Sequence, residues 1–224
     1  MRESIGIRPD IMKSIYSFEK CIQSKDVMNQ TVTVKPRPTK WERLFPDYSI
    51  LNEVLDGCRK DADGQCLISR KEVFEEKDNA RKAILALLWG FPNGYRNSDA
   101  GHRNVVKGVL EIAEEKNDRN LTDPMFRAMM AHKGIGLSTL SKMLYFFEYK
   151  IDGKPALILD SNVMKNMPTF SEFESIVNRS LRTFEGYASY VNRMTEIADK
   201  MNGVTPDQLE FFLFERGKEK NEAR

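Results

Sequence analysis

Two short helix-forming segments, joined by the sequence Gly-Ile-Gly at residues 134–136, constrain the fold of this chain more than any other feature. In the first segment Asp123 can cap the helix, Pro124 suits its first position, and Gly134 can end it. The second segment has apolar residues at the i, i+3, i+4, i+7 spacing of one helix face, namely Leu140, Met143, Leu144 and Phe147. We therefore expect two short helices and a glycine hairpin within residues 123–149.

Helical patterns also dominate the rest of the chain. Ser69 and Glu72 have the spacing of a capping box, and the helical pattern that follows them ends at Gly90 and Pro92. Further helical patterns occur at about residues 10–21, 101–115, 184–201 and 205–220. Strand signals are scarce, so the sequence predicts a mostly α fold.

The composition is that of a packed, soluble globule. Of the 224 residues, 41% are hydrophobic and 30% are charged, which argues against a disordered or fibrous chain. No window of about 18 residues is apolar throughout, and the first residues lack the apolar core and cleavage site of a secretory signal. We therefore expect a cytoplasmic protein with no membrane partner. A monomer is also expected.

The cysteines and the net charge exclude other classes of protein. Cys21, Cys58 and Cys66 are odd in number, widely spaced and distant from both histidines, so we expect neither a disulfide framework nor a zinc site. An iron–sulfur cluster would need four closely spaced thiolates. The net charge of only +2 does not by itself indicate a nucleic-acid partner, and any basic surface must come from clustering.

Residues 1–40 are expected to form one helix and a basic connector, followed by a main domain at residues 41–224. The connector sequence NQTVTVKPRPTK contains two prolines and several β-branched residues, which favour an extended chain. Its basic character comes from Lys35, Arg37, Lys40 and the nearby Arg43. A solvated linker is the favoured interpretation of such a charge run.

The hairpin and its second helix have the features of an anion site. Glycines allow close approach, and backbone N–H groups at a helix N-terminus favour negative charge. Lys142, just over one turn into the second helix, could add a positive charge beside a phosphate. A glycine C-cap between two core helices explains the same sequence without any ligand.

An acidic residue ends the apolar run that follows this second helix. Ala156 to Leu159 are apolar, and Asp160 stands where a new helix could begin, within a segment at residues 156–167. An aspartate in that position is commonly a helix N-cap. Capping is compatible with a chemical role for the same carboxylate.

GIGLSTLSKMLYFF and ALILDSNVMK, in this order, resemble the helix-hairpin-helix DNA glycosylases, which cut the N-glycosidic bond of a base. The separation of 22 residues between Ser138 and Asp160 is slightly long for the family, and YKIDGKP looks like the extension. Together with LLWGFPNGYR, the series is most similar to the bacterial branch resembling 8-oxoguanine glycosylases. The resemblance covers most of the chain past residue 40, and it implies a two-lobed all-helical fold with a central cleft for double-stranded DNA.

The chemistry of base removal suits Asp160. Breaking the glycosidic bond develops positive charge on the sugar, and a fixed carboxylate beside C1′ stabilises that charge and orients or deprotonates water. Family members that also cut the backbone use a lysine at the position of Ser138, and a hydroxyl cannot form the required imine. The resemblance therefore implies a monofunctional glycosylase, with Ser138 lining the cleft or, as the favoured role, capping its helix.

The resemblance implies that the hairpin contacts DNA, and the sequence before it offers a candidate base pocket. The hairpin residues expected to contact DNA are Lys133, Gly134, Ile135, Gly136, Ser138, Thr139 and Lys142. A base flipped from the duplex needs an aromatic pocket with polar groups at its edge. The chosen residues for this pocket are Trp89, Phe91, Asn93, Tyr95 and Arg96, although such aromatic residues are commonly part of the core.

Several alternatives stay open at this point. Lys133 and Lys142 are rival amines, and either one would make the enzyme a bifunctional glycosylase/AP lyase if it reached C1′; Lys142 is expected nearer the phosphate. A non-catalytic helix-hairpin-helix module that only binds DNA is the other alternative. No metal or cofactor is expected, except that the resemblance suggests K⁺ or Na⁺ on hairpin carbonyls. The base that is removed also stays open. If it is oxidised guanine, the function is base excision repair of DNA damage, and if it is a hypermodified cytosine of bacteriophage DNA, the function is anti-phage defence.

Overall fold

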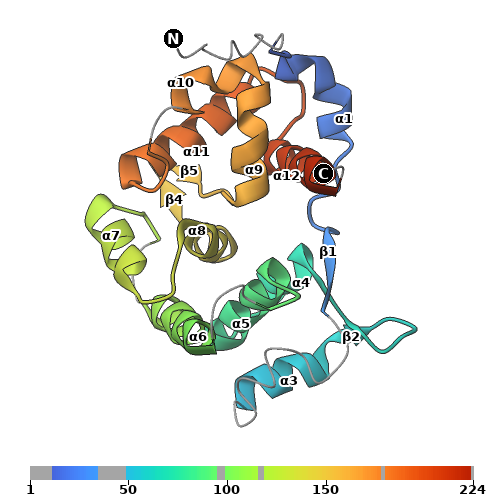
Figure 1. Cartoon of the computed structure of the whole chain (residues 1–224), viewed down its shortest axis with the longest axis vertical. Helices are drawn as coiled ribbons and strands as arrows, with labels where there is room; N and C mark the ends of the chain where they lie inside the picture. Colours follow the sequence, from blue (N-terminus) through green and yellow to red (C-terminus); the bar gives the residue numbers. More distant parts are fainter. Residues whose placement is uncertain (1–11, 35–48, 95–98, 116–118, 178–179, 223–224) are drawn as a thin grey trace, which may run out of the picture.

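The computed structural model describes residues 12–34, 49–94, 99–115, 119–177 and 180–222. Its helices are α1 (Glu19–Gln23), α3 (Ser49–Gly57), α4 (Arg70–Glu75), α5 (Asn79–Gly90), α6 (Asp99–Glu114), α7 (Asp123–Ala131), α8 (Leu137–Phe146), α9 (Ser161–Asn166), α10 (Glu174–Val177), α11 (Phe184–Ala198) and α12 (Pro206–Glu222). Short 3-10 helices occur at Ile15–Phe18, Met167–Thr169 and Ser171–Phe173. The prediction of a mostly α fold is confirmed (Figure 1).

The hairpin helices form as expected, with a shift of one residue at the first. Thr122 occupies the N-cap position of α7 with an extended backbone but without a side-chain capping bond, so Asp123 and Pro124 occupy the first two helical positions. The carboxylate of Asp123 instead accepts a hydrogen bond from Arg127 at 2.7 Å. Asp123 therefore does not cap this helix as predicted.

Helix α8 lies at the centre of the molecule (Figure 1). Nine of its ten residues are buried, because helices α5, α6 and α7 pack on it from one side and the segment before α9 packs on the other. A helix that is covered on nearly all sides holds its side chains in fixed directions. This placement is what fixes the positions of Ser138 and Lys142.

Two helical boundaries differ from the sequence-based expectation. The pattern expected near residues 10–21 begins as the 3-10 helix Ile15–Phe18, where Glu172 accepts hydrogen bonds from Ser14 Oγ and Ile15 N. The long helix expected after Ser69 is divided into α4 and α5, because Asp78 caps a new helix. The capping box of Ser69 and Glu72 is present as predicted.

The chain also contains a small antiparallel sheet that the sequence did not reveal. Strand β3 (Cys66–Ser69) lies between β1 (Thr31–Val34) and β2 (Arg59–Lys60). A second pair consists of β4 (Lys150–Ile151) and β5 (Lys154–Pro155). Strand β1 agrees with the extended chain expected for the connector, and Val34 is buried. The basic residues interpreted as a solvated linker, Lys35, Arg37, Lys40 and Arg43, lie outside the described residues, so that interpretation stays a prediction.

A disulfide joins Cys58 to Cys66, contrary to the expectation that no such bond is encoded. The turn between β2 and β3 folds the chain back on itself and brings the two Cα atoms to 5.6 Å. Strand pairing therefore brings together two cysteines that are eight residues apart, and the number and spacing of the cysteines do not reveal this. Cys21 is free and exposed.

Helix α12 packs tightly on α9, the helix that begins at Asp160. Gly217 makes this contact possible, because a Cβ atom there would lie 2.2 Å from the backbone oxygen of Asn162.

Within the described part of the chain, no helix has the length and apolarity needed to cross a bilayer.

Replacement of Gly217 by alanine should separate α12 from α9. We expect Gly217→Ala to lower the free energy of unfolding by about 1–3 kcal/mol, the usual cost of overpacking, as measured by urea denaturation. Gly57→Ala is the control, because its Cβ would meet only Arg81 Nη2, at 3.8 Å. That change should be neutral or stabilising through helix propensity; equal effects of the two changes would contradict this account.

Candidate active site

A cleft of about 1290 Å³ opens beside α8. It is lined by side chains from β1, the end of α5 and the loop after it, α8, the start of α9, and α12. These elements come from the whole length of the described chain. Asp160, Ser138 and Lys142 all line this cleft.

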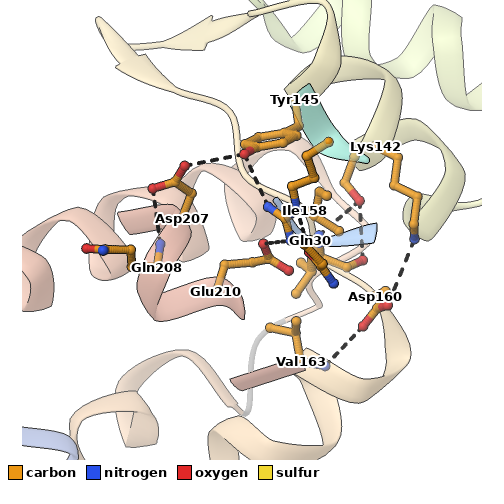
Figure 2. A network of polar contacts seen from close by, with 12 residues as sticks. Gln30, Lys142, Tyr145, Ile158, Asp160, Val163, Asp207, Gln208 and Glu210 are labelled. Carbon is orange, nitrogen blue, oxygen red and sulfur yellow. Dashed lines mark hydrogen bonds and ion pairs between the residues drawn. The ribbon is translucent and has the colours of Figure 1, made fainter. Parts of the chain in front are cut away.

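Asp160 both caps α9 and faces the cleft. Its Oδ1 accepts backbone hydrogen bonds from Asn162 at 2.9 Å and Val163 at 3.1 Å. Asp160 is 8% exposed, so its carboxylate is held in place and still has access to the cleft. The expected helix cap is confirmed, and the second oxygen remains turned toward Lys142 (Figure 2).

The apolar run before Asp160 is anchored by hydroxyl groups. Tyr187 donates to the carbonyl of Leu157 at 2.6 Å, and Tyr190 donates to that of Ile158 at 2.8 Å. The backbone N–H of Leu159 donates to Ser141 Oγ at 3.0 Å. Because these bonds are buried, they hold the position of the carboxylate that follows.

Lys142 points into the cleft and not toward the outer side of the hairpin. Its Nζ lies 3.9 Å from Asp160 Oδ2 (Figure 2). The same Nζ donates to Ser138 Oγ at 2.9 Å. Gly90 leaves room for the lysine stem, since a Cβ atom there would lie 2.5 Å from Lys142 Cδ. The expectation that Lys142 lies on the phosphate side of the site stays a prediction.

The environment of Lys142 favours the neutral amine. The side chain is almost completely buried, and this burial lowers the pKa of Lys142, although the nearby carboxylates of Asp160 and Glu210 act in the opposite direction. Phe91 adds an aromatic face, with its ring centroid 5.1 Å from Nζ. An uncharged amine beside a carboxylate is chemically a nucleophile.

Ser138 does not cap α8, so the favoured interpretation of its hydroxyl was wrong. The N-cap is Gly136, which has no side chain to accept from the first turn. Ser138 instead accepts a hydrogen bond from Lys142 with its hydroxyl oxygen, and its carbonyl accepts a second one at 3.2 Å. The residue thus orients the lysine four positions later.

The two hairpin glycines differ in what they accommodate. Gly134 has φ +89°, and a Cβ atom there would lie 2.9 Å from the backbone N of Val105. Gly136 has no such neighbour within 4 Å, so its missing side chain leaves space at the start of α8. Lys133 is exposed, whereas the side chains of Ile135 and Thr139 are buried.

Three of the five predicted pocket residues line the cleft. Trp89, Phe91 and Asn93 do so, and the indole of Trp89 donates to the carbonyl of Gln30 at 3.3 Å. Tyr95 and Arg96 lie outside the described residues. The loop after α5 therefore contributes aromatic surface to the cleft.

A buried ion pair beside the cleft was not found from the sequence. Arg70 Nη2 donates to Glu210 Oε2 at 2.7 Å, and both side chains are almost fully buried. Burial raises the pKa of Glu210, although Arg70 lowers it. The spacing of α12 could have indicated the burial of Glu210. Leu213 and Gly217 follow it at i+3 and i+7, and all three residues lie on one buried face.

A family model covers most of the chain. The family described as "Putative 8-oxoguanine DNA glycosylase OGG-like protein" matches residues 25–214. No curated protein and no solved structure matches the chain. The matched range contains Asp160, Lys142 and Glu210.

The buried amine predicts a dependence of stability on pH. Because the pKa of Lys142 is lowered by folding, the unfolded chain binds its proton more readily between the folded-state pKa and the ordinary value of 10.5. The free energy of unfolding should therefore rise with pH in that window. Urea denaturation between about pH 7 and pH 10 should show a rise that Lys142→Met lacks and that Lys20→Met, at an exposed position, retains. Identical slopes for the wild type and Lys142→Met would contradict the burial effect.

Proposed function

The chain belongs to the OGG-like family of putative 8-oxoguanine DNA glycosylases, and we propose that it removes a damaged or modified base from double-stranded DNA. The observation that carries this proposal is the contact between Asp160 and Lys142 within one cleft. A carboxylate can stabilise the positive charge that develops at C1′ as the glycosidic bond breaks, and an amine can attack that carbon.

Asp160 acts on the sugar. As the base leaves with the electrons of the glycosidic bond, positive charge develops at C1′ and on the ring oxygen, and an adjacent carboxylate stabilises it. The two backbone N–H groups on Oδ1 keep the carboxylate oriented before the substrate arrives. The same group can accept the proton that the attacking nucleophile loses.

The nucleophile is either water or the amine of Lys142. Ser138 at the usual lysine position argues for water, whereas the amine 3.9 Å from Asp160, with its lowered pKa, favours Lys142. Attack by the amine at C1′ would release the base and, on opening of the sugar, form an imine that permits strand cleavage. Bifunctional glycosylase/AP lyase activity is therefore the second candidate function, and this observation favours it.

The hairpin is proposed to hold the DNA backbone. The open space at Gly136 and the N–H groups at the start of α8 suit a phosphate, and Lys133 is exposed beside them. A K⁺ or Na⁺ ion on hairpin carbonyls stays a proposal, as do the two-lobed arrangement, the monomeric state and the cytoplasmic location. Oxidised guanine and hypermodified cytosine remain the candidate bases, for repair and for anti-phage defence respectively.

Replacement of Asp160 by asparagine tests the enzymatic assignment. Asparagine also caps helices, so Asp160→Asn should fold and bind DNA, while base release should fall about 100-fold or more. The assay incubates duplexes with lesions, together with phage genomes, and detects released bases by mass spectrometry and abasic sites by alkaline cleavage. Unchanged base release in this variant would refute the role of Asp160, and a wild type that releases no base would favour a module that only binds DNA.

Borohydride reduction distinguishes the two nucleophiles. If Lys142 attacks C1′, the wild type should become covalently trapped on a duplex from which it releases the base. Lys142→Gln should lose the adduct, and Lys133→Gln, which changes an exposed hairpin lysine, should retain it. Base release by the wild type without any adduct would instead establish water as the nucleophile.

A further inference from the structure

The carboxylate of Glu210 is one strong polar group of the cleft that the proposed chemistry does not use. It extends from α12, lines the same cleft as Asp160, and is only 1% exposed. Its Oε2 accepts from Arg70, but its Oε1 has no hydrogen-bond partner among the residues that the structure describes. A buried carboxylate oxygen without a donor is costly, so a native structure that retains one calls for an external donor.

Arg70 does not bond to Oε1, because each of its three nitrogens donates to another acceptor. Its Nε donates to Gln30 Oε1 at 2.5 Å, and its Nη1 donates to Tyr145 Oη at 3.1 Å. The rings of Trp89 and Tyr145 lie 5.0 and 5.2 Å from the guanidinium carbon. Arg70 therefore holds the carboxylate in one orientation and leaves Oε1 open.

The surroundings of Glu210 fit a flat ring with a polar edge. Trp89, Phe91, Phe211 and Phe214 line the cleft. The carboxylate points toward the side of the cluster where Ile158, Asp160 and Lys142 lie (Figure 2). The negative charge of Asp160 raises the pKa of Glu210, so the two carboxylates are close enough to interact.

We propose that Glu210 Oε1 accepts a hydrogen bond from an exocyclic amino group of the everted base, with Arg70 as its positioning residue. The inference rests on the proposed function and names its substrate class: bases of the guanine, cytosine or adenine type, which carry such an amine. Thymine and uracil offer a ring N–H flanked by two carbonyl groups, which a carboxylate oxygen repels. The aromatic side chains of the cleft then bind the ring, and Glu210 reads its edge.

Binding to paired duplexes that differ by one amino group tests this assignment. One pair contains guanine or hypoxanthine, and another contains cytosine or pyrimidin-2-one, each opposite an abasic-site analogue so that the amine makes no base pair. The protein carries Asp160→Asn to prevent release, and fluorescence anisotropy is recorded at about pH 8.5, where Glu210 is ionised because its pKa is about 7. Loss of the amine should weaken binding about tenfold.

The same measurement on Glu210→Gln separates recognition from structure. The amide keeps an oxygen for Arg70 and turns an NH₂ group toward the base, so duplexes without the amine should then bind as well as, or better than, those with it. Glu196→Gln, which changes an exposed residue of α11 paired with Arg193, should preserve the wild-type preference. A general loss of packing would weaken every duplex alike and would not reverse the preference.

The comparison between duplexes uses the protein with Glu210 intact, so it remains decisive if Glu210→Gln does not fold. Equal affinity for duplexes with and without the amine would overturn the role of Glu210. An amine-dependent affinity without base release by the wild type would support this role and overturn the proposed glycosylase activity. Base release by the wild type, with an affinity that does not depend on the amine, would support the glycosylase activity and overturn the role of Glu210.

Discussion

The buried guanidinium group of Arg70 joins segments that lie far apart in the sequence. It donates to Gln30, Tyr145 and Glu210, at separations of 40, 75 and 140 residues. Because an uncompensated buried charge costs several kcal/mol, about 3–5 when one partner is removed, these segments cannot separate easily. The residue before β1, helix α8 and helix α12 are held around one cleft as a result, although Arg70 does not line it.

The parts of the site that depend on short-range patterns were predictable from the sequence. The capping box of Ser69 and Glu72, the helix cap at Asp160, and the turn at Gly134 each form within a few residues, so spacing alone determines them. The order of hairpin, apolar run and carboxylate then pointed to Ser138, Lys142 and Asp160, which line one cleft. The helix class followed from the same periodicity, whereas the boundary between α4 and α5 depended on an additional cap at Asp78.

The missed features depend on contacts between distant segments. Strand β1 exists because Val34 and its neighbours pair with β3, and four residues carry too weak a signal by themselves. The pairing of β2 and β3 likewise brings the two bonded cysteines together. Ser138 and Lys142 are four residues apart, so the sequence predicts that they share a helix face. The direction of this face, toward Asp160, depends on the packing of Lys142 against Gly90, which the sequence does not show.

The ion pair and the amine are also linked through their charges. At Lys142, Glu210 raises the pKa and Arg70 lowers it, so the two members of the pair oppose one another and burial remains the largest effect. A base seated against Glu210 would remove further water from the cleft, and removal of water disfavours the charged amine. If both proposals hold, base recognition and activation of Lys142 are two consequences of the same exclusion of water, and a base that binds poorly at Glu210 also leaves the amine more often protonated.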